Sequence, residues 1–127
     1  HLHLCWDDFE LKDAYRLIYA LDKFIALPMM LREPYNERRN LYGKASCFRF
    51  KAYGERQGIE YRTLSGWCVN DLEFVWDQLM LAFNWLEDEM LKPFSIETAH
   101  IEDWELISNL IDNNNIEDVQ NYLAQTE

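Results

Sequence analysis

The segment from Asp71 to about Leu91 constrains the fold most, because its pattern is that of one long helix. Asn70 followed by Glu73 is an N-cap signature, and Pro93 is expected to stop the helix. One apolar stripe repeats at spacings of three and four residues: Leu72, Val75, Trp76, Leu79, Ala82, Phe83, Leu86 and Met90. A second apolar set lies partly beyond this stripe: Phe74, Leu81 and Trp85. A helix that is apolar over most of its circumference is central to its domain or buries a face against a partner.

A second helix is predicted near the start of the sequence. Asp7 followed by Glu10 indicates an N-cap with an acid at the third helical position. Apolar residues then recur at helical spacing: Leu11, Ala14, Ile18, Leu21 and Ile25. Pro28 is expected to end this helix or to kink it close to Leu27. Residues 1–6 alternate between polar and apolar types, which favours a short strand before the helix.

The middle of the sequence favours a β-hairpin. Residues 48–53 and 59–63 both alternate with period two, and the glycine-containing stretch 54–58 joins them. A helix is the alternative, because several apolar residues also fit helical spacing: Leu41, Ala45, Phe48 and Ala52. Gly43 and Gly54 disfavour that helix.

Two shorter helices are predicted at the end of the sequence. Ile101, Trp104 and Ile107 mark the first, and the run 113–115 of three asparagines separates it from a second helix that Asn115 caps. We therefore predict a single globular domain over residues 1–127. Its fold class is helix-dominated α+β: strand, helix, hairpin and helix, followed by two short C-terminal helices. An all-α bundle is the alternative if the hairpin is absent.

The charge of the chain is strongly acidic. It has 12 Lys and Arg against 23 Asp and Glu, for a net charge of −11. The segment 32–62 is the exception, with eight basic and four acidic residues. An acidic field repels nucleic acid and anionic membranes, and it attracts basic protein surfaces. We therefore expect no membrane association and regard nucleic acid as an unfavoured partner.

The sequence contains no recognisable catalytic, cofactor or metal-binding motif. His1, His3 and Cys5 would share one face of a strand, but no fourth zinc ligand accompanies them, and His100 has no motif around it. Four glycines in total cannot form a GxGxxG or Walker loop. The three cysteines lack CxxC spacing, so we expect mostly buried thiols, a reducing compartment and, by default, the cytoplasm. We expect no enzyme activity, cofactor or metal.

The favoured function is stoichiometric binding to a protein with a basic surface, as an inhibitor or immunity-type protein does when it covers a nucleic-acid-handling partner. The candidate partner-binding residues lie on the long helix: Phe74, Leu81, Trp85, Glu87, Asp88 and Glu89. A homodimer that buries the same apolar residues is one alternative. Nucleic-acid binding through the basic segment is the other, with these candidate residues: Arg38, Arg39, Arg49, Lys51, Arg56 and Arg62.

Overall fold

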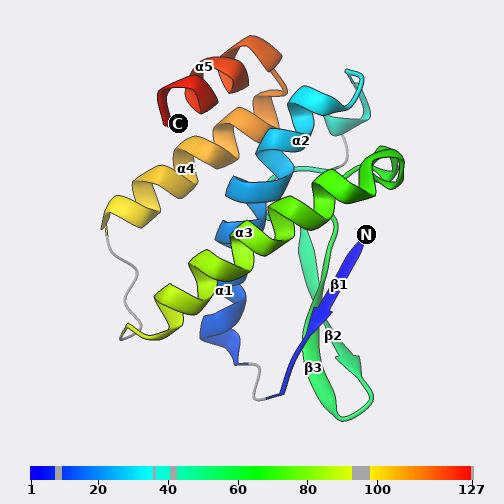
Figure 1. The fold of residues 1–127 in the computed structure, drawn as a ribbon, viewed down its shortest axis with the longest axis vertical. Coiled ribbons are helices and arrows are strands. Elements are labelled where there is room, and N and C mark those ends of the chain that lie inside the picture. Colours follow the sequence, from blue (N-terminus) through cyan, green and yellow to red (C-terminus); the bar gives the residue numbers. More distant parts are fainter. Residues whose placement is uncertain (8–9, 36, 41–42, 93–97, 127) are drawn as a thin grey trace.

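The computed structural model describes residues 1–7, 10–35, 37–40, 43–92 and 98–126 (Figure 1). The strands are β1 (Leu2–Cys5), β2 (Phe48–Tyr53) and β3 (Arg56–Tyr61). The α-helices are α1 (Leu11–Leu21), α2 (Leu27–Arg32), α3 (Leu72–Met90), α4 (Thr98–Asn113) and α5 (Ile116–Thr126). A π-helix, η1 (Asp22–Ala26), and two 3₁₀ helices, η2 (Glu37–Asn40) and η3 (Gly66–Asp71), complete the described elements. This architecture confirms the predicted helix-dominated α+β fold.

The three strands form an antiparallel sheet in the order β1-β3-β2 (Figure 1). Leu4 and Phe50 pair with Ile59 from either side, so these three residues share one face of the sheet. Ile59 is fully buried and β3 contacts α1, which identifies this face as the one turned towards the helices. The neighbouring pairs at Glu60 and Gly58 face the opposite side.

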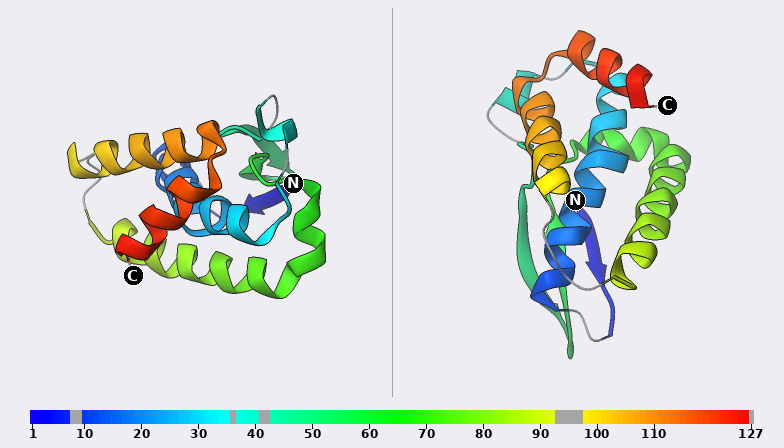
Figure 2. Two further views of the ribbon diagram at one scale, coloured as in Figure 1. Left: turned by 90° about the horizontal axis from the view of Figure 1, so that it is seen from above. Right: turned by 90° about the vertical axis from the view of Figure 1, so that its left-hand side faces the viewer.

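The continuous run α1–η1–α2 forms the centre of the molecule. Its large apolar side chains with 0% exposure are Leu17, Ile18, Leu21, Ile25, Leu27 and Met29. Helix α3 contacts α1 and η1, while α4 and α5 both contact α2. Figure 2 shows the other helices and the sheet arranged around this run. The N-terminal helix is thus the central one, although its sequence pattern is a simple amphipathic stripe.

Pro28 does not end the helix, which was one of the two predicted alternatives. The chain continues as α2 up to Arg32, and the turn before the proline is the π-helix η1. A proline lacks an N–H, and its ring clashes with the carbonyl of the residue four positions earlier, here Phe24. A π-helical turn at this point rearranges the hydrogen-bond ladder where that clash arises. The chain therefore stays helical through the proline.

The β-hairpin predicted over residues 48–63 is confirmed, and the alternative helix is not formed. Its turn is shorter than the predicted loop 54–58, because the strands pair up to the residues on either side of Gly54 and Glu55. Gly54 has a φ of 65°, in the region that favours glycine at a tight hairpin turn. The second strand accordingly begins at Arg56, three residues earlier than predicted. It ends at Tyr61, two residues earlier than predicted.

Two predicted N-caps are displaced along the chain. The N-cap of α1 is Glu10, whose backbone N–H donates to the Asp13 carboxylate at 3.1 Å, so Asp7 is not the cap. The N-cap of α3 is Asp71, one residue after the predicted Asn70. In both places the cap signature indicated a helix start correctly, and the local 3₁₀ or extended backbone set its position.

Helix α3 lies against the central run with one face only. Its buried residues are Val75, Leu79, Ala82 and Leu86. The apolar side chains of Leu72, Trp76 and Met80 are exposed instead, with Trp76 at 62%. The predicted apolar stripe is therefore divided between the core and the surface.

The two C-terminal helices are confirmed. Asn114, with a left-handed φ of 53°, separates α4 from α5. The side-chain oxygen of Asn115 accepts the Asp118 backbone N–H at 3.2 Å, which is the predicted cap. Helix α5 then packs back onto α2.

Within the described ranges, no helix combines the length and apolar character needed to cross a bilayer. Cys5, Cys47 and Cys68 are half-buried thiols outside any disulfide.

Candidate functional site

A groove of about 670 Å³ lies between α2, α3 and α5. Figures 1 and 2 place α2 next to both other helices. The floor comes from η1 and α2, one wall from α3 and the other wall from α5. Its apolar lining is Phe24, Pro28, Leu31, Phe74, Leu81 and Leu123. Its polar lining is Lys23, Arg32, Gln78, Tyr122 and Thr126. The groove exists because α3 and α5 both pack on the central run while making little contact with each other.

Arg32 provides the positive charge at the α2 end of the groove. Its guanidinium carbon lies 4.1 Å from the ring centroid of Phe74, within the range of a cation–π contact. Its Nε–H donates to the Asp71 carboxylate at 2.6 Å. The side chain is 47% exposed, and a guanidinium carries four N–H donors besides the Nε–H.

Lys23 provides the second positive charge, inside a cluster of polar side chains. Its Nζ donates to Asp103 at 3.0 Å and to the Tyr19 hydroxyl at 3.2 Å. The Tyr122 hydroxyl donates to the other Asp103 oxygen at 3.0 Å, and the Tyr19 hydroxyl also donates to Asp103. This cluster joins α1, η1, α4 and α5 at one end of the groove.

The protonation states in this cluster follow from its hydrogen bonds. Burial disfavours the charged form of Asp103, but the donors Tyr19 and Lys23 outweigh this effect and lower the pKa of Asp103. Burial and the Asp103 charge raise the pKa of Tyr122 to about 12 and raise the pKa of Tyr19 as well. At neutral pH the carboxylate is therefore charged and both phenols remain donors.

A separate buried cluster surrounds Asp22, which is fully buried in the π-helix. The Ser46 backbone N–H and hydroxyl donate to Asp22 at 3.0 and 2.8 Å, and the Trp104 indole N–H donates at 3.3 Å. The Tyr61 hydroxyl is a further donor. Burial raises the pKa of Asp22, and these four hydrogen bonds act in the opposite direction without cancelling it. Because its partners come from the sheet and α4, Asp22 joins both layers to the central helix.

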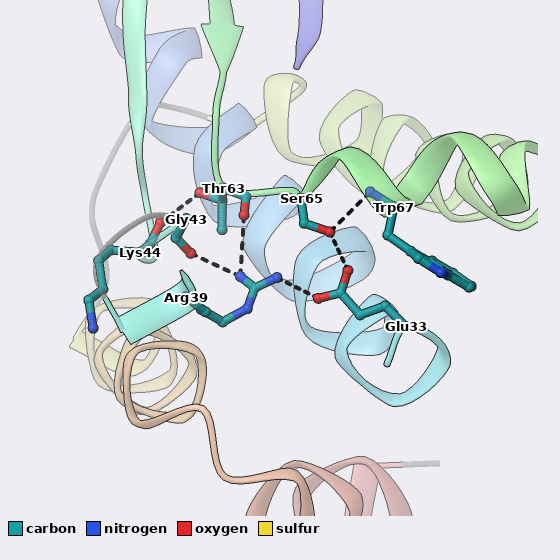
Figure 3. Close-up of polar contacts among 7 residues, drawn as sticks. All are labelled: Glu33, Arg39, Gly43, Lys44, Thr63, Ser65 and Trp67. Carbon is teal, nitrogen blue, oxygen red and sulfur yellow. Dashed lines mark hydrogen bonds and ion pairs between the residues drawn. The ribbon is translucent and has the colours of Figure 1, made fainter. Parts of the chain in front are cut away.

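Arg39, one of the predicted basic-patch residues, is buried in another network (Figure 3). Its Nη2 lies 2.7 Å from Glu33 Oε1, and its Nη1 donates to the carbonyls of Gly43 and Thr63 at 2.9 and 3.2 Å. The Ser65 hydroxyl donates to the second Glu33 oxygen at 2.6 Å. Arg39 therefore cannot belong to an exposed basic surface, because its guanidinium is buried and hydrogen-bonded to groups inside the protein.

The other predicted basic residues are spread over the sheet. Arg49 donates to Glu60, and Arg56 lies 3.0 Å from Asp7. Lys51 shares the outer face of the sheet with Arg49, and Arg62 is exposed just beyond β3. The side chain of Arg38 lies outside the described residues. Phe50 shares a face of the sheet with the buried Ile59, yet on the edge strand β2 it is 53% exposed.

The predicted partner-binding residues of α3 fall into two groups. Phe74 and Leu81 line the groove, while Trp85 is half-buried with its ring centroid 5.0 Å from that of Tyr19. The acids Glu87, Asp88 and Glu89 come from the last turn of α3. Thirteen helical residues, or roughly 20 Å, separate Phe74 from Glu87, whereas Trp85 lies only two residues before Glu87, so the acids adjoin Trp85 rather than Phe74.

Sequence reasoning did not single out Lys23 or Arg32. Both are basic residues on the predicted N-terminal helix or just after it, nine positions apart across Pro28. Because the helix was expected either to end or to kink at the proline, the sequence pattern did not place them on one element. In the described part of the chain, no group of three or more His, Cys, Asp or Glu side chains is arranged to hold a metal ion.

The family of the chain follows from a match over most of its length. The model of a family described as "Phage phiEco32-like COOH.NH2 ligase-type 2" matches residues 1–89, and the chain belongs to this family. The matched range contains the sheet, the central helical run and nearly all of α3, whereas α4 and α5 follow it. No curated protein and no solved structure matches the chain.

Proposed function

We propose that the chain is part of an enzyme that joins a carboxyl group to an amino group. The observation that carries this proposal is the family match over residues 1–89. It makes an enzyme the first candidate, in place of the non-catalytic binding protein that composition alone favours. We keep the cytoplasm as the compartment, in line with the three cysteine thiols.

The chemistry of amide formation explains what such a protein must provide. The amine nitrogen replaces one carboxylate oxygen, so that oxygen must leave with an activating co-reactant, such as the phosphoryl group of a nucleoside triphosphate. The protein must hold the carboxylate in a fixed orientation while this happens. Basic side chains, and arginine above all, suit that task. The groove supports the proposal because it presents Arg32 and Lys23 beside an apolar lining.

A trapping assay tests the proposal. The chain is incubated with ATP, magnesium, hydroxylamine as the amine and a panel of carboxylic acids, and hydroxamate formation is measured. We expect hydroxamate with at least one acid, dependent on both ATP and native protein. Omission of ATP and heat-denatured protein are the controls. The absence of hydroxamate across the panel would contradict a ligase function for this chain.

Protein binding is the second candidate, favoured by the exposed face of α3. Leu72 and Trp76 are each 62% exposed, and the acids Glu73 and Asp77 beside them are exposed too. Exposed tryptophans with acidic neighbours suit a partner with a basic, partly apolar surface. This proposal keeps the acidic binding function suggested by the net charge of −11, but places it on residues other than Phe74 and Trp85.

A pull-down at low and high salt tests the second candidate. The wild-type chain and Trp76→Ala serve as baits, with Arg62→Gln as a surface control on another element. A basic protein that is retained at low salt, lost at high salt and absent with Trp76→Ala is the expected result. Equal recovery by both baits would contradict the assignment to α3. A chain that forms a stable dimer by light scattering, with no other protein bound, would favour self-association instead.

A further inference from the structure

The groove between α2, α3 and α5 is lined by basic side chains and by no described acidic one, although Asp71 and Asp103 pair with these cations from outside the lining. The chain carries 23 acidic and 12 basic residues, yet the described lining of the groove includes Lys23 and Arg32 and no acidic side chain. We propose that this groove binds a monocarboxylic acid with an apolar body, whose carboxylate lies at Arg32. The inference rests on the proposed function only in taking this acid as the carboxyl substrate.

Arg32 is the better of the two cations for a carboxylate. Its stacking on Phe74 restricts the guanidinium, and its contact with Asp71 uses the Nε–H, so the terminal nitrogens can donate to a ligand. A guanidinium held on an aromatic ring and half open to solvent offers the paired donors that a carboxylate prefers.

Lys23 is less suited to the same role. Its ammonium group already donates to the Asp103 carboxylate and to Tyr19, which leaves one of its three N–H donors, whereas Arg32 keeps four N–H donors besides the one that contacts Asp71. Lys23 and Arg32 are also nine residues apart on the helical floor, which corresponds to roughly 13 Å. Because Lys23 is already held by Asp103 and Tyr19, the ligand is oriented with its anionic end at Arg32.

The remainder of the groove fits an apolar body. Between the two cations the lining is supplied by Phe24, Leu31, Leu81 and Leu123. Its volume of about 670 Å³ falls within the range of small-molecule sites. Leu123 belongs to α5, beyond the matched residues 1–89, so this wall is a feature of the present chain that the family match does not include.

Calorimetric titration with matched probes tests the inference. Octanoate, octanol and octylamine share one apolar body and differ in charge, while phenylbutyrate replaces the alkyl body with an aromatic one. We expect at least one of the two acids to bind with a Kd below about 1 mM, and octanol and octylamine to bind at least tenfold more weakly. Equal affinity for octanoate and octanol would overturn the inference, because it would show that the cation takes no part.

Three groove variants and one control variant on the sheet locate the binding. Arg32→Met should weaken the acid by about tenfold or more, whereas Arg32→Lys should retain part of the affinity. Leu123→Asp, which places a negative charge in the α5 wall, should also weaken the acid. Arg49→Met on the outer face of the sheet removes a positive charge far from the groove and should leave binding unchanged. Equal loss with Arg49→Met would show a nonspecific charge effect and overturn the assignment.

The two proposals can fail separately. Binding of octanoate that depends on Arg32, without hydroxamate formation, would leave the groove assigned and remove the ligase function. Hydroxamate formation whose KM for the acid is unchanged in Arg32→Met would support the ligase function and remove the assignment of the groove. Circular dichroism and the thermal midpoint of each variant establish that it is folded before its affinity is compared.

Discussion

Arg39 and Glu33 form an ion pair 2.7 Å long whose side chains are only 2% and 6% exposed. The pair links η2 to the end of α2, and through the Thr63 carbonyl and the Ser65 hydroxyl it also links both to the segment after β3 (Figure 3). Each charge has further hydrogen-bond partners, which is the condition under which a buried ion pair is tolerated. The network therefore holds three segments that secondary structure alone does not connect.

Loss of one partner of this pair should destabilise the fold strongly. Arg39→Met leaves the Glu33 carboxylate buried without its cation, which typically costs about 3–5 kcal/mol. Urea unfolding followed by circular dichroism measures the change. Arg56→Met, which removes an exposed ion pair with Asp7, is the matched control and should cost at most about 1 kcal/mol. Similar losses for both variants would contradict a special role for the buried pair.

Gly58 should not tolerate alanine. A Cβ at this position would lie 2.2 Å from the Leu4 carbonyl oxygen, on the neighbouring strand β1. Gly58→Ala should therefore cost about 2 kcal/mol or more and should reduce hydrogen-exchange protection in β1. Gly66→Ala is the control, because no atom lies within 4 Å of its Cβ position. Unchanged protection of β1 in Gly58→Ala would show that the strand pairing is different.

Two substitutions on α3 should separate its buried and exposed faces. Leu79→Ala removes a side chain that is 8% exposed and should cost about 2–5 kcal/mol. Trp76→Ala should change the free energy of unfolding by no more than about 0.5 kcal/mol, because its side chain lies largely in solvent. Thermal unfolding of both variants provides the comparison. A large loss for Trp76→Ala would place that face in a self-association interface.

The contribution of Asp22 to stability should depend on pH. Burial raises its pKa in the folded state, so the folded protein binds a proton more readily than the unfolded chain. As pH rises from the pKa of Asp22 in the unfolded chain through its pKa in the folded protein, the wild type therefore loses stability. Asp22→Asn has no titrating group at this position and does not show this loss. Asp22→Asn also places an amide donor among four donors, which should cost about 1–3 kcal/mol.

The difference in stability between wild type and Asp22→Asn should accordingly be larger at pH values near 4 than at neutral pH. Urea unfolding of both proteins across this range tests the prediction, since the titration of all other carboxylates is common to the two. A difference that grows as pH rises would mean that the folded pKa of Asp22 is lowered instead.

Much of the secondary structure could be predicted because its signals are local. The alternation in residues 1–6, the glycine at position 54 and the Asn115 cap each act within a few residues, and each predicted its element correctly. Errors occurred at boundaries, where the Asp7 cap competed with the Glu10 cap actually formed three residues later. At Pro28, where the helix was expected to end or to kink, a π-helical turn before the proline keeps the helix continuous.

The candidate site could be predicted only in part. The apolar pattern of residues 71–91 indicated Phe74 and Leu81 as lying partly beyond the main stripe of α3, and both line the groove. It could not identify Arg32 as their neighbour, since the two segments are some 40 residues apart in the sequence. The basic segment likewise suggested a single patch, whereas Arg39 is buried and Arg49 and Arg56 each have an acidic partner.

The sequence by itself determined the helix-dominated α+β class, the order of the elements and the acidic character of the chain, because these depend on periodicity, caps and composition. Only the tertiary structure decided which helix is central, which apolar residues of α3 remain exposed, and that Arg32 and Phe74 meet at a groove closed by Leu123. The physical reason is that local patterns specify which residues prefer burial, whereas the packing of whole helices decides which of them find a neighbour.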